Sequence, residues 1–366
     1  MPDSRVYGFT DSIYYSEIAD AIRSKAGTTE LYEPSKMGSA IRNIPSGGGS
    51  DDNFKIKCGA MSGSVYDTQA SVVGSYGLYH NNGITGIEMP NVETIRESAF
   101  EACGHLEYAI FPKCNMVDLN AFTNCGVLSY IEFPKCSEIH HGAFFNCRSL
   151  VNVSFPECSS LSTSVFCYCS NLTSISFPVC EYLGGNAFIS CINLSEINFP
   201  VCSSIGFYAF SNCRGLVSIN IPACEYIGSN AFRDCINLVS LSPLSVCKNI
   251  SSYAFYNCSK LSEINIPACE YIGSGAFTSC DLRIISAPEC SYIGVQTFFG
   301  NTKLSAVYIL SSSIVSLTSP TAFGNTPISD STYLGYFGSI YVPTSLADAY
   351  KVANNWSLYA DKIVGI

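Results

Sequence analysis

Apolar positions return along most of the chain with a period of 22 residues. The unit that spans residues 213–232 is representative. Its apolar side chains at Leu216, Ile219 and Ile221 alternate in a way that suits a short strand with one buried side. Pro222 follows directly and is expected to end the strand, because proline has no backbone N–H for a central ladder. Each unit therefore predicts one short strand and a break after it.

The second half of the unit predicts turns. Ile227 is apolar and precedes Gly228, which favours a turn at that point. The pair Ala231-Phe232 then leads into the next unit and predicts a tight helical or 3₁₀ turn. A unit of this size cannot bury its own apolar side, so successive units must stack as coils. About eleven coils with strands roughly 4.8 Å apart predict a slab about 50 Å long.

One phenylalanine per unit makes the repeat easy to follow. Its spacing is 22 residues six times in succession and then 23, 22, 21 and 25 residues. Such regularity over eleven copies cannot be coincidence, so the array is the main feature of the fold. These residues are Phe100, Phe122, Phe144, Phe166, Phe188, Phe210, Phe232, Phe255, Phe277, Phe298 and Phe323.

Composition and charge exclude several classes of protein. The chain has 366 residues, 47% hydrophobic and 13% charged, which is enough apolar content for a large core and excludes a mostly disordered protein. A formal net charge of −10 argues against binding nucleic-acid phosphates or an anionic membrane. No apolar stretch is long enough to span a bilayer, and the first residues do not resemble a secretory signal. Neither a nucleic-acid partner nor membrane insertion is expected.

Most of the 20 cysteines follow the repeat, at its first and twelfth positions, and only Cys58 and Cys167 fall outside these two columns. A disulfide framework, a metal array and a column of buried thiols are the alternatives. Equivalent cysteines in adjacent coils would lie within disulfide range, but side chains stacked in parallel disfavour the required torsion. An interval of eleven residues does not match zinc spacing. Small apolar thiols suit a narrow interior column, so a ladder of reduced thiols is the favoured interpretation.

The repeat resembles the BspA-like class of bacterial leucine-rich repeats. The motif that carries the resemblance is L-x-x-I-x-[IF]-P followed by I-G-x-x-A-F-x-x-C, over about residues 84–325. The sequence departs from the commoner family pattern by placing cysteine at position twelve of nearly every coil. The resemblance implies a curved, β-rich solenoid with a parallel sheet on one side, used for binding rather than for chemistry.

The two ends of the chain differ from the array. Residues 1–44 predict a small helical module, and residues 45–50 a Gly/Ser linker. The module resembles a short segment of tail and baseplate proteins in phages of Gram-positive bacteria, and this resemblance implies a role in attachment or oligomerisation. Residues 51–83 are expected to form an N-terminal cap over the solenoid at 84–325, and 326–366 a C-terminal cap with Trp356 in its core. Caps are needed because an open apolar end invites aggregation.

Two rows of side chains are the candidate ligand-binding residues. Small polar side chains recur at the outward position of the strand and would form an uncharged surface rich in hydroxyl and amide groups. A row of tyrosines follows the position-twelve cysteines, and tyrosine supplies large contact area at low entropy cost. The alternatives are that the polar residues only solvate the sheet or form amide ladders, and that the tyrosines cover neighbouring side chains. The candidates are Ser154, Ser176, Asn198, Asn220, Asn265, Tyr182, Tyr226, Tyr271 and Tyr292.

Catalytic chemistry has no comparable signal in the sequence. His140 and His141 are adjacent, and adjacent residues in an extended chain face opposite ways, so they seldom hold one metal. No nucleophile elbow, phosphate-binding loop or metalloprotease motif is present. We therefore expect no enzyme activity, no catalytic residues, no metal and no cofactor.

These features predict a non-enzymatic receptor-binding or adhesion protein. The N-terminal module would attach it to other proteins of a phage tail, and the solenoid would bind a host cell-surface glycan or protein. A homo-oligomer such as a trimer is expected because it adds avidity. The predicted location is the virion tail, with assembly in the bacterial cytoplasm.

Three alternatives remain open at this stage. The first is a bacterial cell-surface adhesin of the BspA type that binds host matrix proteins, for which an export signal or anchor would be needed. The second is a purely structural tail spacer, which would bind nothing. A wall-degrading enzyme is the third, and it would need paired carboxylates or a metal cluster in a non-repeating region.

Overall fold

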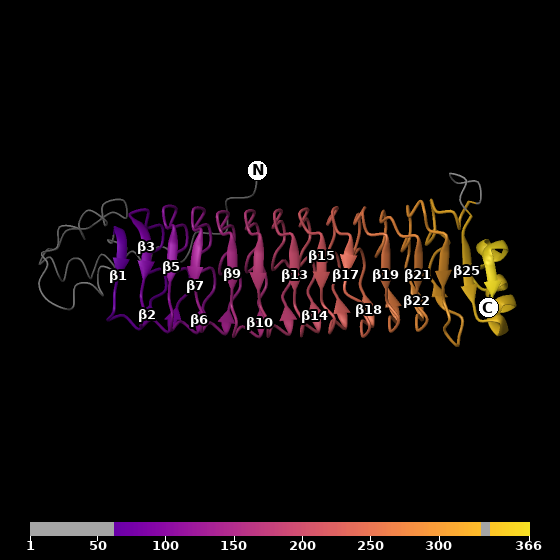
Figure 1. Cartoon of the computed structure of the whole chain (residues 1–366), viewed down its shortest axis with the longest axis horizontal. Coiled ribbons are helices and arrows are strands. Elements are labelled where there is room, and N and C mark those ends of the chain that lie inside the picture. The colour runs from indigo at the N-terminus through magenta and orange to yellow at the C-terminus, as the bar shows by residue number, and fades with distance from the viewer. Residues whose placement is uncertain (1–61, 331–336) are drawn as a thin grey trace, which may run out of the picture.

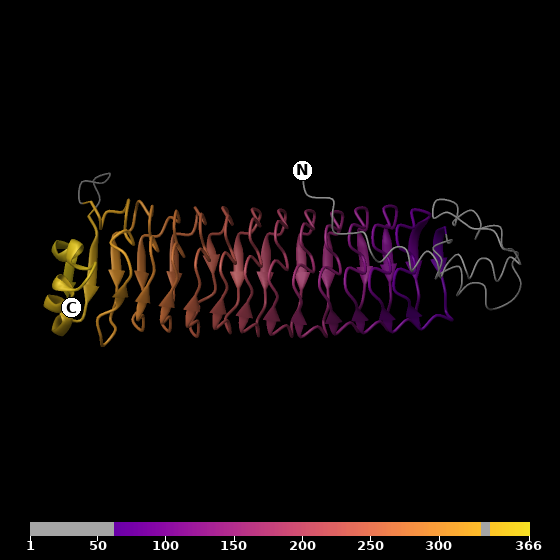
Figure 2. The same cartoon turned by 180° about the vertical axis from the view of Figure 1, so that it is seen from behind.

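The computed structural model describes residues 62–330 and 337–366, which form one elongated row of coils (Figure 1). Each coil contributes short parallel strands to two rows that run along the solenoid, and the same rows are seen from behind (Figure 2). The predicted helical module at 1–44, the linker at 45–50 and Cys58 lie outside the described residues. The β-rich solenoid with 22-residue coils is confirmed.

The first strand row begins each coil, and in most of its three-residue strands the central side chain points inward. In β15, for example, Ile219 is buried while Asn220 is exposed. The row is divided into parallel sheets of 4, 2, 3 and 5 strands, with breaks after β7, β11 and β17. Its strands are β1 (Gly63–Tyr66), β3 (Ile84–Glu88), β5 (Tyr108–Ile110), β7 (Tyr130–Glu132), β9 (Asn152–Ser154), β11 (Ser174–Ser176), β13 (Glu196–Asn198), β15 (Ser218–Asn220), β17 (Ser240–Leu241), β19 (Glu263–Asn265), β21 (Ile284–Ser286), β23 (Ala306–Tyr308), β25 (Ser339–Val342) and β26 (Ile363–Gly365).

A second strand row corrects the prediction of a turn at Ile227 and of a sheet on one side only. Ile227 lies in β16 and pairs with Ile205, inside one continuous 12-stranded parallel sheet. The strands are only two residues long, with the first side chain outward and the second buried. They are β2 (Val72–Val73), β4 (Thr94–Ile95), β6 (Met116–Val117), β8 (Glu138–Ile139), β10 (Ser160–Leu161), β12 (Tyr182–Leu183), β14 (Ser204–Ile205), β16 (Tyr226–Ile227), β18 (Asn249–Ile250), β20 (Tyr271–Ile272), β22 (Tyr292–Ile293) and β24 (Ser316–Leu317).

A turn segment around the Ala-Phe pair returns the chain to the next coil. Residues two before and two after the phenylalanine have positive φ, as at Asn230 (59°) and Asp234 (60°), which prevents a continuous helix. Successive backbone N–H groups donate alternately within the turn and to the next coil. The N–H of Arg233 donates to the carbonyl of Asn230 in the same turn, and the N–H of Phe232 donates to the carbonyl of Ala254 in the next coil. The segment is therefore a third backbone ladder between coils rather than a helical turn. Its outer surface is called the turn face below.

Stacked phenylalanine rings run through the interior from Phe100 to Phe323. The rings of the Ala-Phe pairs stack almost parallel, with Phe188 5.4 Å from Phe166 and 5.3 Å from Phe210 between ring centroids. A second stack, from Phe111 to Phe199, packs against the first at steep or tilted angles. Both stacks are buried, so the repeat of 22 residues is fixed by aromatic contacts between coils as well as by strand pairing.

The nineteen cysteines among the described residues are all free and buried, which agrees with the predicted thiol ladder. The S–H groups of the two columns donate to backbone carbonyls. Cys213 in the first column donates to Phe188 at 3.1 Å, and Cys224 in the second column donates to Tyr226 at 3.3 Å. Asn301 takes the first-column place near the C-terminal end and donates to Phe277 at 2.7 Å. The thiols thus give a second hydrogen bond to turn carbonyls such as that of Phe188, which already accepts from the N–H of Cys191.

The C-terminal end is closed by η2 (Thr344–Leu346), α4 (Ala347–Val352), η3 (Ser357–Lys362) and β26, which stand beyond β25 in Figure 1. Trp356 is buried, packs against Tyr350 and donates its indole N–H to the carbonyl of Val315 at 2.7 Å. This agrees with its predicted place in a capping core. At the other end, β1 pairs with β3, so a coil with Leu78 in place of phenylalanine precedes the eleven expected from the motif.

Gly228 is required by the close approach of neighbouring coils. A Cβ at this position would lie 2.7 Å from the backbone carbonyl carbon of Gly206, whereas a Cβ at Gly126 would meet nothing within 4 Å. We expect Gly228→Ala to lower the free energy of unfolding by about 1–3 kcal/mol, as overpacking does. Gly126→Ala should stay within about 0.5 kcal/mol of the parent chain. Urea unfolding followed by circular dichroism measures both, and equal effects of the two variants would contradict the proposed contact.

Candidate functional sites on the solenoid surface

The predicted polar row lies on the outer surface of the first strand row, called the first-row face. Five of its members occupy the last position of their strands and are exposed: Ser154, Ser176, Asn198, Asn220 and Asn265. Strand pairing sets Ser154 beside Ser176 and Asn198 beside Asn220. The structure therefore brings these side chains into one line.

Part of this line forms an amide ladder. The Nδ2 of Asn220 donates to the Oδ1 of Asn198 at 2.7 Å. Beside this line, at the first position of β9 and β11, the hydroxyl of Ser174 donates to the Oδ1 of Asn152 at 2.6 Å. Each such bond leaves other donors and acceptors of the pair directed to solvent. The row can thus stabilise the coil stack and still present polar groups to a ligand.

Two hollows interrupt the first-row face where its sheet is broken. The first hollow, about 420 Å³, lies over β7, β9 and β11, and Tyr130, Ser154 and Ser176 line it. The second hollow, about 490 Å³, lies over β17, β19 and β21, and Asn265 and Ile284 line it. Tyr130 and Ile284 are each 51% exposed, so each hollow has a large apolar side chain in contact with solvent.

The predicted tyrosine row lies on the second strand row, at the outward position of its strands. Tyr182 and Tyr226 are exposed, whereas Tyr271 and Tyr292 are half-buried because their rings stack 4.5 Å apart. The phenol oxygen of Tyr226 accepts a hydrogen bond from Ser251 at 3.1 Å. The four tyrosines thus belong to a different surface from the polar row, and two of them already cover each other.

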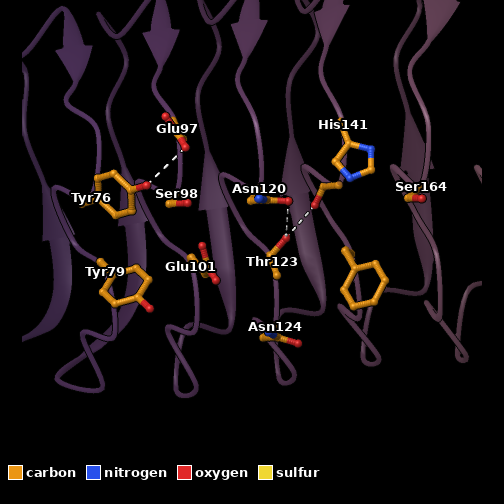
Figure 3. Close-up of a pocket in the computed structure, with 12 residues that line it drawn as sticks. Tyr76, Tyr79, Glu97, Ser98, Glu101, Asn120, Thr123, Asn124, His141 and Ser164 are labelled. Carbon is orange, nitrogen blue, oxygen red and sulfur yellow. Dashed lines mark hydrogen bonds between the residues drawn. The ribbon is translucent and has the colours of Figure 1, made fainter. Parts of the chain in front are cut away.

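A groove of about 520 Å³ crosses the turn face near the N-terminal end (Figure 3). Figure 3 shows Tyr76 and Tyr79 at one end, Glu97, Glu101 and Asn120 between, and then His141 and finally Ser164 towards the other end. Successive coils supply these side chains from equivalent places beside the Ala-Phe pair. The full lining is Tyr76, Tyr79, Glu97, Ser98, Glu101, Asn120, Thr123, Asn124, His141, Gly142, Phe145 and Ser164.

Hydrogen bonds fix several of the groove's side chains. The hydroxyl of Tyr76 donates to the carboxylate of Glu97 at 3.2 Å. Burial raises the pKa of Tyr76, and the charge of Glu97 raises it further, so the phenol remains a donor at neutral pH. The hydroxyl of Thr123 donates to the carbonyl of Gly142 at 2.7 Å. These bonds hold the lining in place without using the carboxylate of Glu101.

The adjacent histidines have separate partners. The Nδ1 of His140 lies 2.9 Å from Asp118, and the Nδ1 of His141 lies 2.6 Å from the hydroxyl of Thr163. Burial would raise the pKa of Asp118, but hydrogen bonds from His140 and from the Leu119 N–H lower it overall. Within residues 62–330 and 337–366, no three His, Cys, Asp or Glu side chains are grouped so that they could hold a metal ion.

The groove was not predicted from the sequence, although a signal for it is present. One column of the repeat directly follows the phenylalanine of each turn, or Leu78 in the first coil. In four successive coils this column holds Tyr79, Glu101, Thr123 and Phe145. Comparing that column would have placed a ring at each end and a carboxylate between them. The coil that holds Tyr79 was hidden because Leu78 replaces the repeating phenylalanine.

Comparison with known proteins identifies the family. The chain matches the family described as BspA type Leucine rich repeat region (6 copies), over residues 71–194, 181–305 and 225–341. The protein therefore belongs to the BspA-type leucine-rich repeat family. No match is found among curated proteins. The matched ranges begin at residue 71, so they give no support to the resemblance of residues 1–44 to phage tail proteins.

One solved structure shows the same fold, and two others are similar with lower TM-scores. A leucine-rich repeat protein from Bacteroides ovatus is 21% identical, with 85% of each chain covered and a TM-score of 0.61. The pneumococcal vaccine antigen PcpA is 15% identical over 83% of this chain and 77% of its own, with a TM-score of 0.47. A leucine rich cell surface protein from Faecalibacterium prausnitzii is 18% identical over 83% and 91%, with a TM-score of 0.39. In the part of the chain that the structure describes, no helix is long and apolar enough to cross a membrane.

Proposed function

We propose that the chain is a non-enzymatic adhesion protein that binds a protein partner on its first-row face. The observation that supports this most directly is the pair of hollows in the face, each with a half-exposed apolar side chain beside polar groups. Buried apolar anchors with a polar surround are the usual anatomy of a protein interface. Arg283 lies beside Ile284 in the second hollow and adds a residue type that is enriched at such interfaces.

The interior offers little room for other chemistry. The core is filled by aromatic, aliphatic and thiol side chains, and burial raises the pKa of thiols such as Cys213 to about 12. A buried thiol with a raised pKa is a poor nucleophile, because the thiolate is the reactive form. The side chains available for function are therefore those of the surface, which favours binding over catalysis.

We place this binding at a bacterial cell surface, as the family assignment suggests for an adhesin, with a host matrix or other cell-surface protein as the partner. The other possibility is a role as a phage tail protein. That proposal depends on residues 1–44, which lie outside both the family match and the described residues. Attachment through these residues to other virion proteins, and a homo-oligomer such as a trimer, remain predictions. Sedimentation equilibrium of the full chain measures the mass of the assembly and so gives the number of chains in it.

The test compares variants of the full chain in their affinity for cells and for surfaces coated with matrix proteins. Asn198→Ala/Asn220→Ala/Asn265→Ala and Ile284→Ser are each expected to weaken binding about tenfold or more, because each removes contacts worth about 1.4 kcal/mol or more. Val201→Ala alters a side chain that is 44% exposed and outside both hollows, so it serves as the matched control. Unchanged affinity in both test variants, with folding intact, would refute the choice of face.

A further inference from the structure

We infer that the groove on the turn face is a second binding site, separate from the first-row face, and that it takes a neutral oligosaccharide. Its volume of about 520 Å³ lies within the usual range of ligand sites. Aromatic rings line both of its ends, with Tyr76 and Tyr79 5.7 Å apart at one end and Phe145 at the other. Rings of this kind stack on the apolar C–H faces of sugar rings.

The middle of the groove supplies hydrogen-bonding groups of the right kind for sugar hydroxyls. Glu101 offers a half-buried carboxylate, which accepts hydrogen bonds only. Asn124 offers an exposed amide whose Nδ2 can donate, while its Oδ1 accepts from Asn146 at 2.8 Å. The carboxylate of Glu97 is already oriented by Tyr76. Sugar hydroxyls are donors and acceptors in adjacent pairs, so carboxylates and amides between aromatic rings recognise them without a charged ligand.

Charge distinguishes the ligand class. The lining contains two carboxylates, Glu97 and Glu101, and neither lysine nor arginine. An anionic ligand such as a phosphorylated, sulfated or uronic acid polymer would be repelled and would find no bidentate cation. A neutral or N-acetylated sugar meets no such penalty. The groove therefore favours neutral glycans over the acidic polymers that basic surfaces bind.

Aromatic residues continue along the turn face beyond the groove. Tyr168, 46% exposed, packs edge-on against Phe145 with ring centroids 5.6 Å apart. Phe207 and Tyr253 lie further along the solenoid, and each ring rests on the backbone of a glycine in an adjacent coil. A Cβ at Gly185 or Gly275 would lie 2.5 Å from the ring, so these glycines let the rings lie flat.

Flat rings of this kind present a platform rather than a pocket. Phe207 and Tyr253 remain 49% and 40% exposed although they cover backbone on one side. Platforms at several coils, on the same face as the groove, suit a chain of sugars rather than a single one. We therefore assign the groove as the part that contributes most affinity in a longer binding surface for an extended neutral glycan.

Isothermal titration of the full chain with four hexasaccharides tests the assignment. The probes are the β-1,4-linked hexamers of glucose and of N-acetylglucosamine, the β-1,4-linked hexamer of mannose, and hexagalacturonate as the anionic control. We expect at least one neutral hexamer to bind and hexagalacturonate not to bind. Phe145→Ala and Glu101→Gln should each weaken the neutral ligand at least tenfold.

Controls separate this site from the first-row face. Ile192→Ala changes a side chain that is 43% exposed and outside the groove, and it should leave sugar affinity unchanged. The Asn198→Ala/Asn220→Ala/Asn265→Ala variant should also bind the sugar normally, whatever its affinity for a protein partner. Glu101→Gln keeps the shape of the side chain, so it tests the site even if Phe145→Ala fails to fold. Three outcomes would overturn the assignment: no binding of any of the three neutral hexamers, a preference for hexagalacturonate, or folded Phe145→Ala and Glu101→Gln variants that bind the sugar as tightly as the unmodified protein.

Discussion

Between pH 8 and pH 10 the protein is expected to unfold, because its buried thiols resist ionisation. Burial raises the pKa of Cys213 and Cys247 to about 12 and that of Cys158 to about 11. In the unfolded chain a cysteine has a pKa of about 8.5, so above that pH the unfolded state binds fewer protons than the folded state. The free energy of unfolding therefore keeps its full value below about pH 8.5 and falls as the pH rises towards the pKa of the folded-state thiols.

The size of this effect follows from the number of thiols. One pH unit above the unfolded pKa costs about 1.4 kcal/mol for each thiol that stays protonated in the folded state. Nineteen cysteines are buried among the described residues, and burial raises the pKa of eighteen of them. At that pH their summed effect on the free energy of unfolding exceeds the roughly 5–15 kcal/mol by which folded domains are typically stable.

Urea unfolding in reducing buffer at a series of pH values from 7 to 10 measures the effect. The slope of unfolding free energy against pH gives the number of protons released on unfolding, and we expect it to be large and negative. Buried tyrosines such as Tyr350 also have a raised pKa, from burial, so their ionisation is followed separately by ultraviolet absorbance. Cys213→Ala should reduce the proton count by about one. A free energy that stays flat to pH 10 would contradict the buried thiol ladder.

Phe188→Ala is expected to lower the free energy of unfolding by about 3–5 kcal/mol. The ring is completely buried and stacks on Phe166 and Phe210 in the adjacent coils. Its removal leaves a cavity that close-packed coils cannot collapse into, because both neighbours are held by their own backbone ladders. Since each coil contacts only its neighbours, the defect also weakens coupling between the two halves of the array.

Phe207→Ala is the matched control for this substitution. Phe207 is 49% exposed on the turn face, so its removal creates no interior cavity and should cost less than about 1 kcal/mol. Thermal and urea unfolding report the difference. A second transition in Phe188→Ala alone would show that the array has separated into two cooperative units. Equal stability of the two variants would mean that the stacked rings do not fix the spacing of the coils.

Sequence reasoning recovered the features that repeat strongly and missed those that are short. The 22-residue period, the strand that ends before Pro222 and the buried thiols follow from regular spacing and side-chain chemistry. The second strand row was missed at Ile227 because two residues are too few to show alternation. Pairing with the coils on either side makes it a strand, and that information is not local.

The candidate sites divide in the same way. Exposed rows such as Asn198 and Asn220 could be predicted because one strand position points outward in every coil. The turn-face groove could not, since its lining comes from residues that differ in kind between coils, among them Tyr79, Glu101 and Phe145. The repeating pattern reveals the scaffold and its outward rows, whereas the groove consists of departures from that pattern. The residues that vary between coils are therefore the place to look for function.

Saturable binding of the full chain to a surface partner is the central claim, and one binding isotherm tests it most directly. Fluorescently labelled protein is titrated onto a panel of bacterial and animal cells and onto surfaces coated with matrix proteins. The account predicts saturable binding to a few members of the panel and at least tenfold weaker binding by the Asn198→Ala/Asn220→Ala/Asn265→Ala variant. Folded protein that binds no member of the panel saturably would contradict the adhesion function and favour a structural spacer.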